Sequence, residues 1–220
     1  RQCLQSIVDQ ETDFSFEVIV GDDCSTDGTQ AIIKEFAGRY PGLVKPVFHE
    51  KNVGNCHNLI LVYKKAIGEY IAHMDGDDFM LPGKLKMQAE ELDRNPDCAI
   101  CLHAMKQFDQ HNLRFRKFRP INVPEKSDVA FLLMNLPFFS HSSKMFRSEY
   151  HKGLELPAGE FFDCYLHIHH ALRGKILYLK DALGVYRFGV GLSTAINNDN
   201  SDYVIFKTKM LKLAIDAIEY

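Results

Sequence analysis

The sequence predicts an α/β fold in which a central, mostly parallel sheet is flanked by helices. Apolar runs at 17–21 and 70–74 are typical of buried strands, and apolar residues at helical spacing follow both of them. Strand and helix alternate as β-α-β-α-β-α up to residue 96, which favours parallel strands joined by right-handed crossovers. The 220 residues, of which 46% are hydrophobic, are enough for a sizeable core.

Turn and capping signals delimit the elements of the first half. Asp27-Gly28 marks a turn before the first helix, and Pro41-Gly42 ends that helix. Gly68 is placed to cap the second helix, and Pro82 is placed to open the third. The expected order is strand 17–21, a helix up to 40, strand 44–48, helix 56–67, strand 70–74 and helix 82–95.

The second half is less regular, and we interpret it as an elaboration of the core fold. A polar segment at 109–124 interrupts the alternation. Ser127 is placed to cap a short helix that Pro137 ends. The expected order is strand 98–108, helix 129–136, strand 142–146, helix 161–172, strands 176–179 and 184–186, and helix 202–219.

Composition and charge exclude several classes of partner and location. A net charge of −3 and a pI of about 6.4 provide no overall basic field, so we expect no nucleic-acid partner. No apolar run approaches the ~18 residues of a membrane span. The six cysteines are scattered along the chain, which indicates reduced thiols and a cytoplasmic location. Because the chain starts at Arg1 within helix-like apolar spacing, we expect it to be a piece of a longer protein.

Carboxylates follow both apolar strands. Asp22 and Asp23 come directly after the first strand. Asp75, Asp77 and Asp78 come after the second. Ligands of open α/β sheets bind beyond the carboxyl ends of the strands, where these side chains should lie. In an extended chain Asp75 and Asp77 project to the same side. Two such oxygens suit Mg²⁺, which completes its coordination with water and phosphate oxygens, so the acids predict a metal and a phosphorylated ligand.

The order and spacing of these motifs resemble the inverting glycosyltransferases of family 2, which have the GT-A fold. In the first half the resemblance is carried by Val20-Gly-Asp-Asp-Cys-Ser-Thr-Asp-Gly-Thr29, Asn52-Val-Gly54 and Met74-Asp-Gly-Asp-Asp78. Later segments that match landmarks of the family are His141-Ser-Ser-Lys-Met-Phe-Arg147, Phe162-Asp163 and Val185-Tyr-Arg187. The resemblance covers roughly residues 1 to 195.

The resemblance implies a nucleotide-sugar donor, most often UDP-linked, which is held with Mn²⁺ or Mg²⁺ in the first half, and an acceptor in the second. We accordingly divide a single GT-A domain into a donor-binding half at 1–108, an acceptor-binding and catalytic half at 109–200, and a C-terminal helix at 201–220. The reaction would be a single displacement that inverts the anomeric carbon. The implied roles are a nucleobase contact for Asp22 or Asp23, a ribose or metal contact for Asp75, metal coordination for Asp77, a donor contact for Arg187 and general-base catalysis by Asp163.

Three features differ from the pattern of the family. The family's opening strand would lie before Arg1. Phe162 stands where Glu or Gly often precedes the catalytic Asp, and Glu160 lies two positions earlier, so both Asp163 and Glu160 are candidates for the base. The glycine-rich segment 188–193 lacks the His that the family often carries there, so a contact to the diphosphate is either replaced or missing.

Two further groups of residues could bind a metal. Cys98 and Cys101 have zinc-like spacing, but no second pair exists, and two core residues that point to opposite faces of a strand are the better explanation. Asp163, His167 and His170 share a helix face and could form a second metal site. Alternatively, His167 lies near the base or on the surface.

Two segments could contact a membrane or a lipid-linked partner. Basic and aromatic residues alternate at 114–119, which fits either an anionic lipid-linked acceptor or a solvated hairpin. The helix expected at 202–219 carries Lys207, Lys209 and Lys212 beside an apolar stripe, and it could rest on a membrane surface, on the body of the protein or on a second chain. Peripheral contact with the inner face of the membrane and homodimer formation are therefore both compatible with the sequence.

The sequence favours a metal-dependent inverting sugar transferase that acts on a glycan or lipid-linked acceptor, for example in surface polysaccharide synthesis. A sugar-phosphate nucleotidyltransferase also combines an α/β sheet with acidic metal ligands. That class requires a glycine-rich, basic phosphate loop early in the chain, which the sequence does not contain. The remaining alternative is a catalytically inactive module that binds a nucleotide or a sugar.

Overall fold

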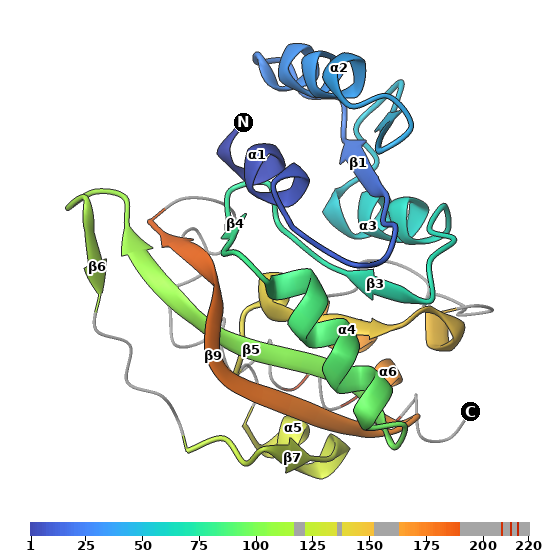
Figure 1. The fold of residues 1–220 in the computed structure, drawn as a ribbon, viewed down its shortest axis with the longest axis vertical. Coiled ribbons are helices and arrows are strands. Elements are labelled where there is room, and N and C mark those ends of the chain that lie inside the picture. Colours follow the sequence, from blue (N-terminus) through green and yellow to red (C-terminus); the bar gives the residue numbers. More distant parts are fainter. Residues whose placement is uncertain are drawn as a thin grey trace.

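A computed structural model describes residues 1–116, 122–135, 138–151 and 163–189, together with Thr208, Lys212 and Ile215, and of Asp163 it describes the backbone alone. Residues 117–119 of the basic segment and nearly all of the helix expected at 202–219 lie outside these ranges. The helices are α1 (Gln2–Val8), α2 (Thr29–Arg39), α3 (Asn55–Tyr63), α4 (Lys84–Arg94), α5 (Val129–Met134) and α6 (Asp163–Ala171), with 3₁₀ helices η1 (His141–Ser143) and η2 (Ser148–His151). The strands are β1 (Val18–Asp22), β2 (Val44–Phe48), β3 (Tyr70–Ala72), β4 (Phe79–Met80), β5 (Cys98–Asp109), β6 (Arg114–Arg116), β7 (Lys126–Ser127), β8 (Met145–Arg147) and β9 (Lys175–Phe188) (Figure 1).

The elements expected for the first half are confirmed, with shifted boundaries. α3 ends before the glycine expected to cap it, because the N–H groups of Lys65 and Ala66 bond to carbonyls three residues back and tighten the chain into a turn. β3 ends at Ala72, two residues earlier than expected. α4 begins after Gly83, whose φ of +84° is a left-handed conformation that suits glycine.

The second half differs more from the expectation. The strands expected at 176–179 and 184–186 are both parts of β9, because register shifts against β5 accommodate the irregular middle of the strand. Asp128, and not Ser127, caps α5, since its Oδ1 accepts a hydrogen bond from the N–H of Phe131 at 2.9 Å. β4, β6 and β7 are too short to produce a recognisable sequence period.

The sheet structure is mixed. β1 and β2 pair in parallel, and a seven-stranded sheet has the order β3-β8-β5-β9-β4, with β6 added to β5 and β7 added to β9. β5 and β9 are parallel, and every antiparallel pair includes a strand from the second half of the chain. Among the described residues, β1 pairs with β2 alone and β3 with β8 alone. The expected α/β class is confirmed.

Two hydrophobic clusters cover the two faces of the larger sheet. On β5, Ile100 and Leu102 belong to one cluster and Cys101 belongs to the other, as side-chain alternation requires. α3, α5 and α6 contribute to the first cluster, and α1, α2 and α4 to the second. Cys98 joins the cluster of Cys101 because a register shift follows it, so the expected opposite orientation is wrong, while both thiols are free core residues. Within the described part of the chain, no helix has the length and apolar character of a membrane span.

A lysine is completely buried where α4 packs on β5. The Nζ of Lys84 donates a hydrogen bond to Oε1 of Gln88 at 2.8 Å. The Nε2 of Gln88 donates to the carbonyls of Cys101 and Ser143, at 2.8 and 2.9 Å. This network connects α4 to β5 and η1. Burial lowers the pKa of Lys84 to about 7, because the ammonium group loses its hydration.

Buried Lys84 should make the stability of the protein depend on pH just above 7. The unfolded chain keeps the ordinary lysine pKa of 10.5, so it binds more protons than the folded chain, and the free energy of unfolding rises with pH. We expect a rise of about 1 kcal/mol per pH unit. Urea denaturation at pH 7 and at about 8.5 measures it. Lys84→Met should show little rise, and parallel curves for the two proteins would contradict the assignment.

Candidate functional site

The acidic residues that follow β3 form a turn that leads into β4. The N–H of Asp78 donates a hydrogen bond to the carbonyl of Asp75 at 3.1 Å, across Gly76 and Asp77. The extended conformation expected for this segment is therefore wrong, because an Asp-Gly sequence favours a turn. The turn nevertheless keeps the two carboxylates so close that the negative charge of Asp75 raises the pKa of Asp77.

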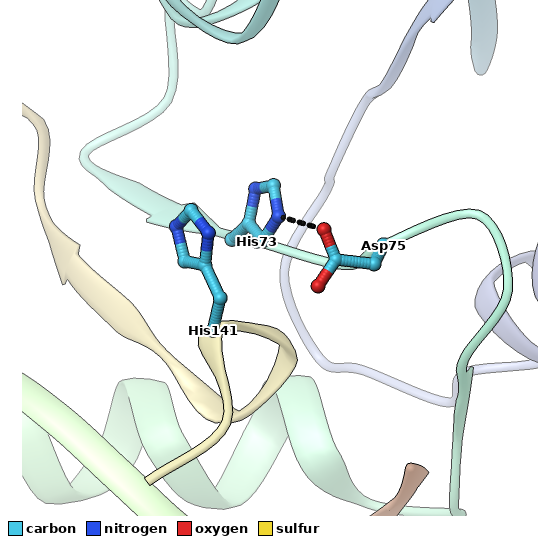
Figure 2. Close-up of side chains that lie close together, drawn as sticks. All are labelled: His73, Asp75 and His141. Carbon is cyan, nitrogen blue, oxygen red and sulfur yellow. Dashed lines mark hydrogen bonds and ion pairs between the residues drawn. The ribbon is translucent and has the colours of Figure 1, made fainter. Parts of the chain in front are cut away.

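Asp75 is held by side chains from two different elements. Nε2 of His73 lies 2.9 Å from Oδ1 of Asp75 (Figure 2). The hydroxyl of Ser142, in η1, donates to Oδ2 of Asp75 at 3.0 Å and accepts the backbone N–H of Asp75 at 3.1 Å. Ser142 is fully buried, so it belongs to the packed interior. The orientation of the Asp75 carboxylate is therefore set by the fold.

Asp77 and Asp78 lie close to Arg187 near the end of β9. Burial raises the pKa of Asp77, the negative charge of Asp75 raises it further, and the positive charge of Arg187 opposes both. Asp78 is 1% exposed, and its Oδ1 accepts the backbone N–H of Arg187 at 2.9 Å. Burial raises the pKa of Asp78 to about 7. The Arg187 guanidinium contacts Gln2 of α1. β9 thus places a cation beside the acidic turn.

Three side chains at this site offer ligand atoms within 4.8 Å of one another, namely His73, Asp75 and His141 (Figure 2). The rings of His73 and His141 are stacked, with centroids 3.7 Å apart and planes inclined by 15°. The nitrogen lone pairs of the two rings lie in nearly parallel planes that are offset by the stacking, so both cannot point at one ion about 2.1 Å away. Burial holds the pKa of His141 well below its usual range, so its ring is neutral at pH 7. As arranged, His73 supports Asp75, His141 stacks on His73, and the two rings do not surround an ion.

Asp22 and Asp23, at the end of β1, organise the loops around them. Oδ2 of Asp22 accepts hydrogen bonds from the N–H of Ser25 at 3.1 Å and from the side chain of Gln30 at 2.8 Å. Burial by itself raises the pKa of Asp22, but these hydrogen bonds outweigh burial and lower it. The two carboxylate oxygens of Asp23 accept the N–H groups of 53–54, at 2.6 and 2.9 Å. Both acids therefore fix backbone at this end of β1.

The loop that Asp23 holds lines a pocket of about 610 Å³. Its walls are formed by Phe48, His49, Glu50, Lys51 and Val53. The side chain of Phe48 is 36% exposed, so part of its ring is available to a ligand. An aromatic ring beside polar groups is suited to bind a flat, partly polar molecule.

α6 approaches the acidic site from the second half of the chain. His167 is 4% exposed, its ring meets that of His141 edge to face at 4.8 Å, and its Nδ1 lies 3.0 Å from Nζ of Lys144. His167 is therefore an interior residue, and the alternative of a surface position is wrong. α6 begins at Asp163, one turn before His167. The side chains of Asp163 and Glu160 lie outside the described residues.

The sequence model of glycosyl transferase family 2 matches residues 1–154, which include Asp22, Asp23, the acidic turn and Ser142. The chain belongs to glycosyl transferase family 2. The family resemblance drawn from the motifs is thereby confirmed. α6 and β9, which bring His167 and Arg187 to the site, lie beyond the matched residues.

Curated relatives of this family 2 chain come from several bacteria. An uncharacterised protein of Mycobacterium tuberculosis is 35% identical over 189 residues, which are 85% of this chain and 54% of that protein. EpsE of Bacillus subtilis, named as a glycosyltransferase, is 30% identical over 154 residues, or 70% of this chain and 53% of EpsE. TuaG of Bacillus subtilis, named for teichuronic acid biosynthesis, is 30% identical over 122 residues, or 56% of this chain and 46% of TuaG. The chain spans about half the length of these relatives.

Solved structures with the same fold include TarS 1–349 of S. aureus in complex with UDP, with a TM-score of 0.71 and 22% sequence identity. The match covers 99% of this chain and 60% of the TarS chain. The mannosyltransferase PcManGT of Pyrobaculum calidifontis, in complex with GDP-Man and Mn²⁺, gives a TM-score of 0.63 and 20% identity over 99% of this chain and 59% of that one. At these identities the likeness concerns the fold. The family 2 chain has the GT-A fold that its motifs imply.

The structure of this family 2 chain brings Asp77 close to both Asp75 and Arg187. It also adds His73 and Ser142, to which the sequence analysis gave no role. His73 carries a usable signal, because it stands two residues before Asp75 and so tends to lie on the same side of an extended chain. Ser142 is 67 positions from Asp75, and no local pattern predicts their contact.

Proposed function

We propose that this chain is the donor-binding and catalytic part of a metal-dependent inverting glycosyltransferase, with 1–108 serving the donor and 109–200 the acceptor. The observation that carries the proposal is the acidic turn, where Asp75 and Asp77 lie beside Arg187. Two carboxylates alone would repel a diphosphate. A divalent cation placed between the acids and the phosphates turns this repulsion into attraction, and an arginine adds charge-assisted hydrogen bonds.

Asp77 and Asp75 are the residues that would hold the cation. Burial and the charge of Asp75 raise the pKa of Asp77. A bound divalent ion would favour the charged carboxylate and so lower this pKa again. Carboxylate oxygens suit Mg²⁺ and Mn²⁺, and PcManGT was solved with Mn²⁺. When bound, the ion would stabilise the negative charge that the diphosphate gains as the glycosidic bond breaks.

The end of β1 and the neighbouring pocket are proposed to bind the nucleobase. The ring of Phe48 offers a stacking face, and Asp23 fixes the loop that completes the pocket. Oδ1 of Asp22 is buried and has no hydrogen-bond partner among the described residues, so Asp22 has an unused acceptor for the N3–H of uracil. A base could reach this atom only if the loop after β1 moved. TarS was solved with UDP and PcManGT with GDP-Man, and we propose UDP as the nucleotide to test first.

The acceptor hydroxyl requires a base, because its pKa lies far above 7. A carboxylate that takes its proton as the new bond forms contributes ~10²–10⁴-fold. We assign this role to Asp163, with Glu160 as the alternative. The contact of His167 with His141 brings α6 to the donor side of the molecule, which supports a base on this helix. Attack on the face opposite the leaving diphosphate would invert the anomeric carbon.

The acceptor is proposed to be a growing polysaccharide or a lipid-linked glycan, and the protein is proposed to act in the cytoplasm. Support for the acceptor comes from the name of TuaG, which refers to teichuronic acid biosynthesis.

Calorimetric titration of UDP, with and without Mn²⁺, tests the proposed function. We expect saturable binding that requires the metal, accompanied by slow hydrolysis of a UDP-sugar when no acceptor is present. Binding of GDP or dTDP in place of UDP would change the donor and leave the role of the acidic turn intact. If no nucleotide bound with any divalent metal, the proposal would be refuted.

Replacement of Ser142 tests whether the support of Asp75 matters for the metal. Ser142→Ala removes two hydrogen bonds, one to Oδ2 of Asp75 and one from the backbone N–H of Asp75. We therefore expect ~10–100-fold weaker Mn²⁺-dependent binding of UDP. Ser143→Ala is the matched control, since Ser143 is also fully buried but its hydroxyl bonds to the carbonyl of Ser140. Equal effects of the two substitutions would show that only packing is disturbed.

A further inference from the structure

The hairpin formed by β5 and β6 exposes apolar and basic side chains at its tip. β6 pairs antiparallel with the end of β5, with Phe115 opposite Phe108. Leu113 is 71% exposed and Phe115 is 60% exposed. Arg114 and Arg116 are exposed as well. Figure 1 shows β6 at the outer edge of the molecule, so the tip can reach a large surface.

Leu113 occupies a position that ordinary turn chemistry gives to glycine or asparagine. Its φ is +48°, a left-handed conformation that is unfavourable for a residue with a large side chain. The rest of the turn is well ordered, because Asp109 accepts the N–H groups of His111 and Asn112 at 3.1 and 3.0 Å. An exposed leucine in such a conformation does not stabilise the folded chain. Strained positions of this kind occur where a function requires them, which makes a contact outside the chain the hypothesis to test.

The tip is locally cationic in a chain whose net charge is −3. Residues 110–116 include two arginines and neither Asp nor Glu. The neighbouring Asp109 is 7% exposed and is occupied by the turn. The guanidinium of Arg116 lies 4.0 Å from the ring centroid of Phe188, which is 38% exposed. Strand alternation places Phe115 on one face of the hairpin and Arg114, Arg116 and Phe188 on the other, so the tip carries apolar groups on both faces and its arginines on one.

We propose that this tip, Leu113 to Arg116 together with Phe188, docks the protein on an anionic phospholipid bilayer. Leu113 and Phe115 enter the boundary between headgroups and acyl chains, and the two arginines bind lipid phosphates. An acidic protein surface would attract the arginines, but it would offer no apolar environment to the exposed side chains of Leu113 and Phe115. The inference goes beyond sugar transfer and does not depend on the donor assignment.

Docking by this tip would also orient the candidate site. Phe108 is the register partner of Phe115 on one side and of Arg187 on the other, so the three residues form one row across three strands. A Cβ atom at Gly189 would lie 2.6 Å from the ring of His111, so the end of β9 packs closely against the turn. Because Arg187 contacts the acidic turn, a substrate carried by the bilayer would be presented to that end of β9.

Co-sedimentation of the full chain with vesicles tests the proposal. The vesicles are phosphatidylcholine alone or phosphatidylcholine with about one-third phosphatidylglycerol, at low and high salt. We expect salt-sensitive binding to the anionic vesicles. Leu113→Asn should weaken the partition about tenfold without lowering the Tm, because asparagine accepts the left-handed conformation. Exchanging Arg114 and Arg116 for Gln together should weaken it about thirtyfold.

Ile67→Asn is the matched control, since Ile67 is 84% exposed and lies outside the hairpin. This variant should bind vesicles like the unmodified protein. The proposal is overturned if the unmodified protein does not bind, if the hairpin variants bind as it does, or if Ile67→Asn loses as much binding as Leu113→Asn. A dimer that Leu113→Asn dissociates, without any vesicle binding, would assign the tip to a second copy of the chain.

Discussion

Asp77→Asn is expected to lose Mn²⁺-dependent binding of UDP and ~10³-fold of the turnover of a UDP-sugar. The amide replaces one of the two proposed ligand carboxylates, Asp75 and Asp77, and offers a cation a weaker, uncharged ligand. Folding should not suffer, because the pKa of Asp77 is raised by burial and by Asp75, so loss of its charge relieves repulsion. A higher Tm together with lost activity is the combination expected of an acid retained for function.

Asp181→Asn is the control for this experiment, because Asp181 is an exposed carboxylate on β9. It should keep both metal-dependent UDP binding and turnover. Full metal-dependent binding by Asp77→Asn would contradict the proposed ligand set. In that case Asp75 would be the remaining proposed ligand, and Asp75→Asn would be the variant to measure.

Asp163→Asn is expected to lower turnover ~10²–10⁴-fold while the affinity for UDP with Mn²⁺ is unchanged. The separation of the two effects follows from the assigned role, since a base acts on the acceptor hydroxyl and not on the donor. Steady-state transfer and calorimetry on the same preparation measure both quantities. A parallel loss of UDP affinity would instead indicate that Asp163 supports the donor site.

Glu160→Gln distinguishes the two candidates for the base. If Asp163 is the base, Glu160→Gln should retain turnover within a few-fold of the unmodified protein. A large loss in Glu160→Gln, with activity retained in Asp163→Asn, would move the role to Glu160. Retained activity in both variants would show that neither Asp163 nor Glu160 is the base.

Local signals are sufficient to predict most of the elements in the first half of the chain. Asp27-Gly28 and Pro41-Gly42 bracket α2, and the apolar spacing of Leu85, Ala89 and Leu92 identifies the buried face of α4. The acids after β1 and β3 stand out because ligands of open α/β sheets bind beyond the carboxyl ends of the strands. These features depend on residues that are neighbours in sequence, and a single sequence contains them directly.

The parts that the sequence could not predict depend on contacts between distant segments. Lys84 and Gln88 would be taken for a solvated side of α4, yet both are fully buried, because the glutamine satisfies carbonyls on β5 and η1. Ser142 has no pattern that connects it with Asp75. The left-handed conformation of Leu113 contradicts the usual preference of leucine, and only the backbone reveals it.

The pairing of β1 with β2 alone, and of β3 with β8 alone, affects how this chain behaves at high concentration. Each of these strands has a second side on which no described strand satisfies its N–H and C=O groups. Such edges act as templates that recruit a strand from another molecule. We therefore expect the chain to aggregate through these edges at high concentration. A peptide strand that pairs with β1 or β3 should reduce this aggregation.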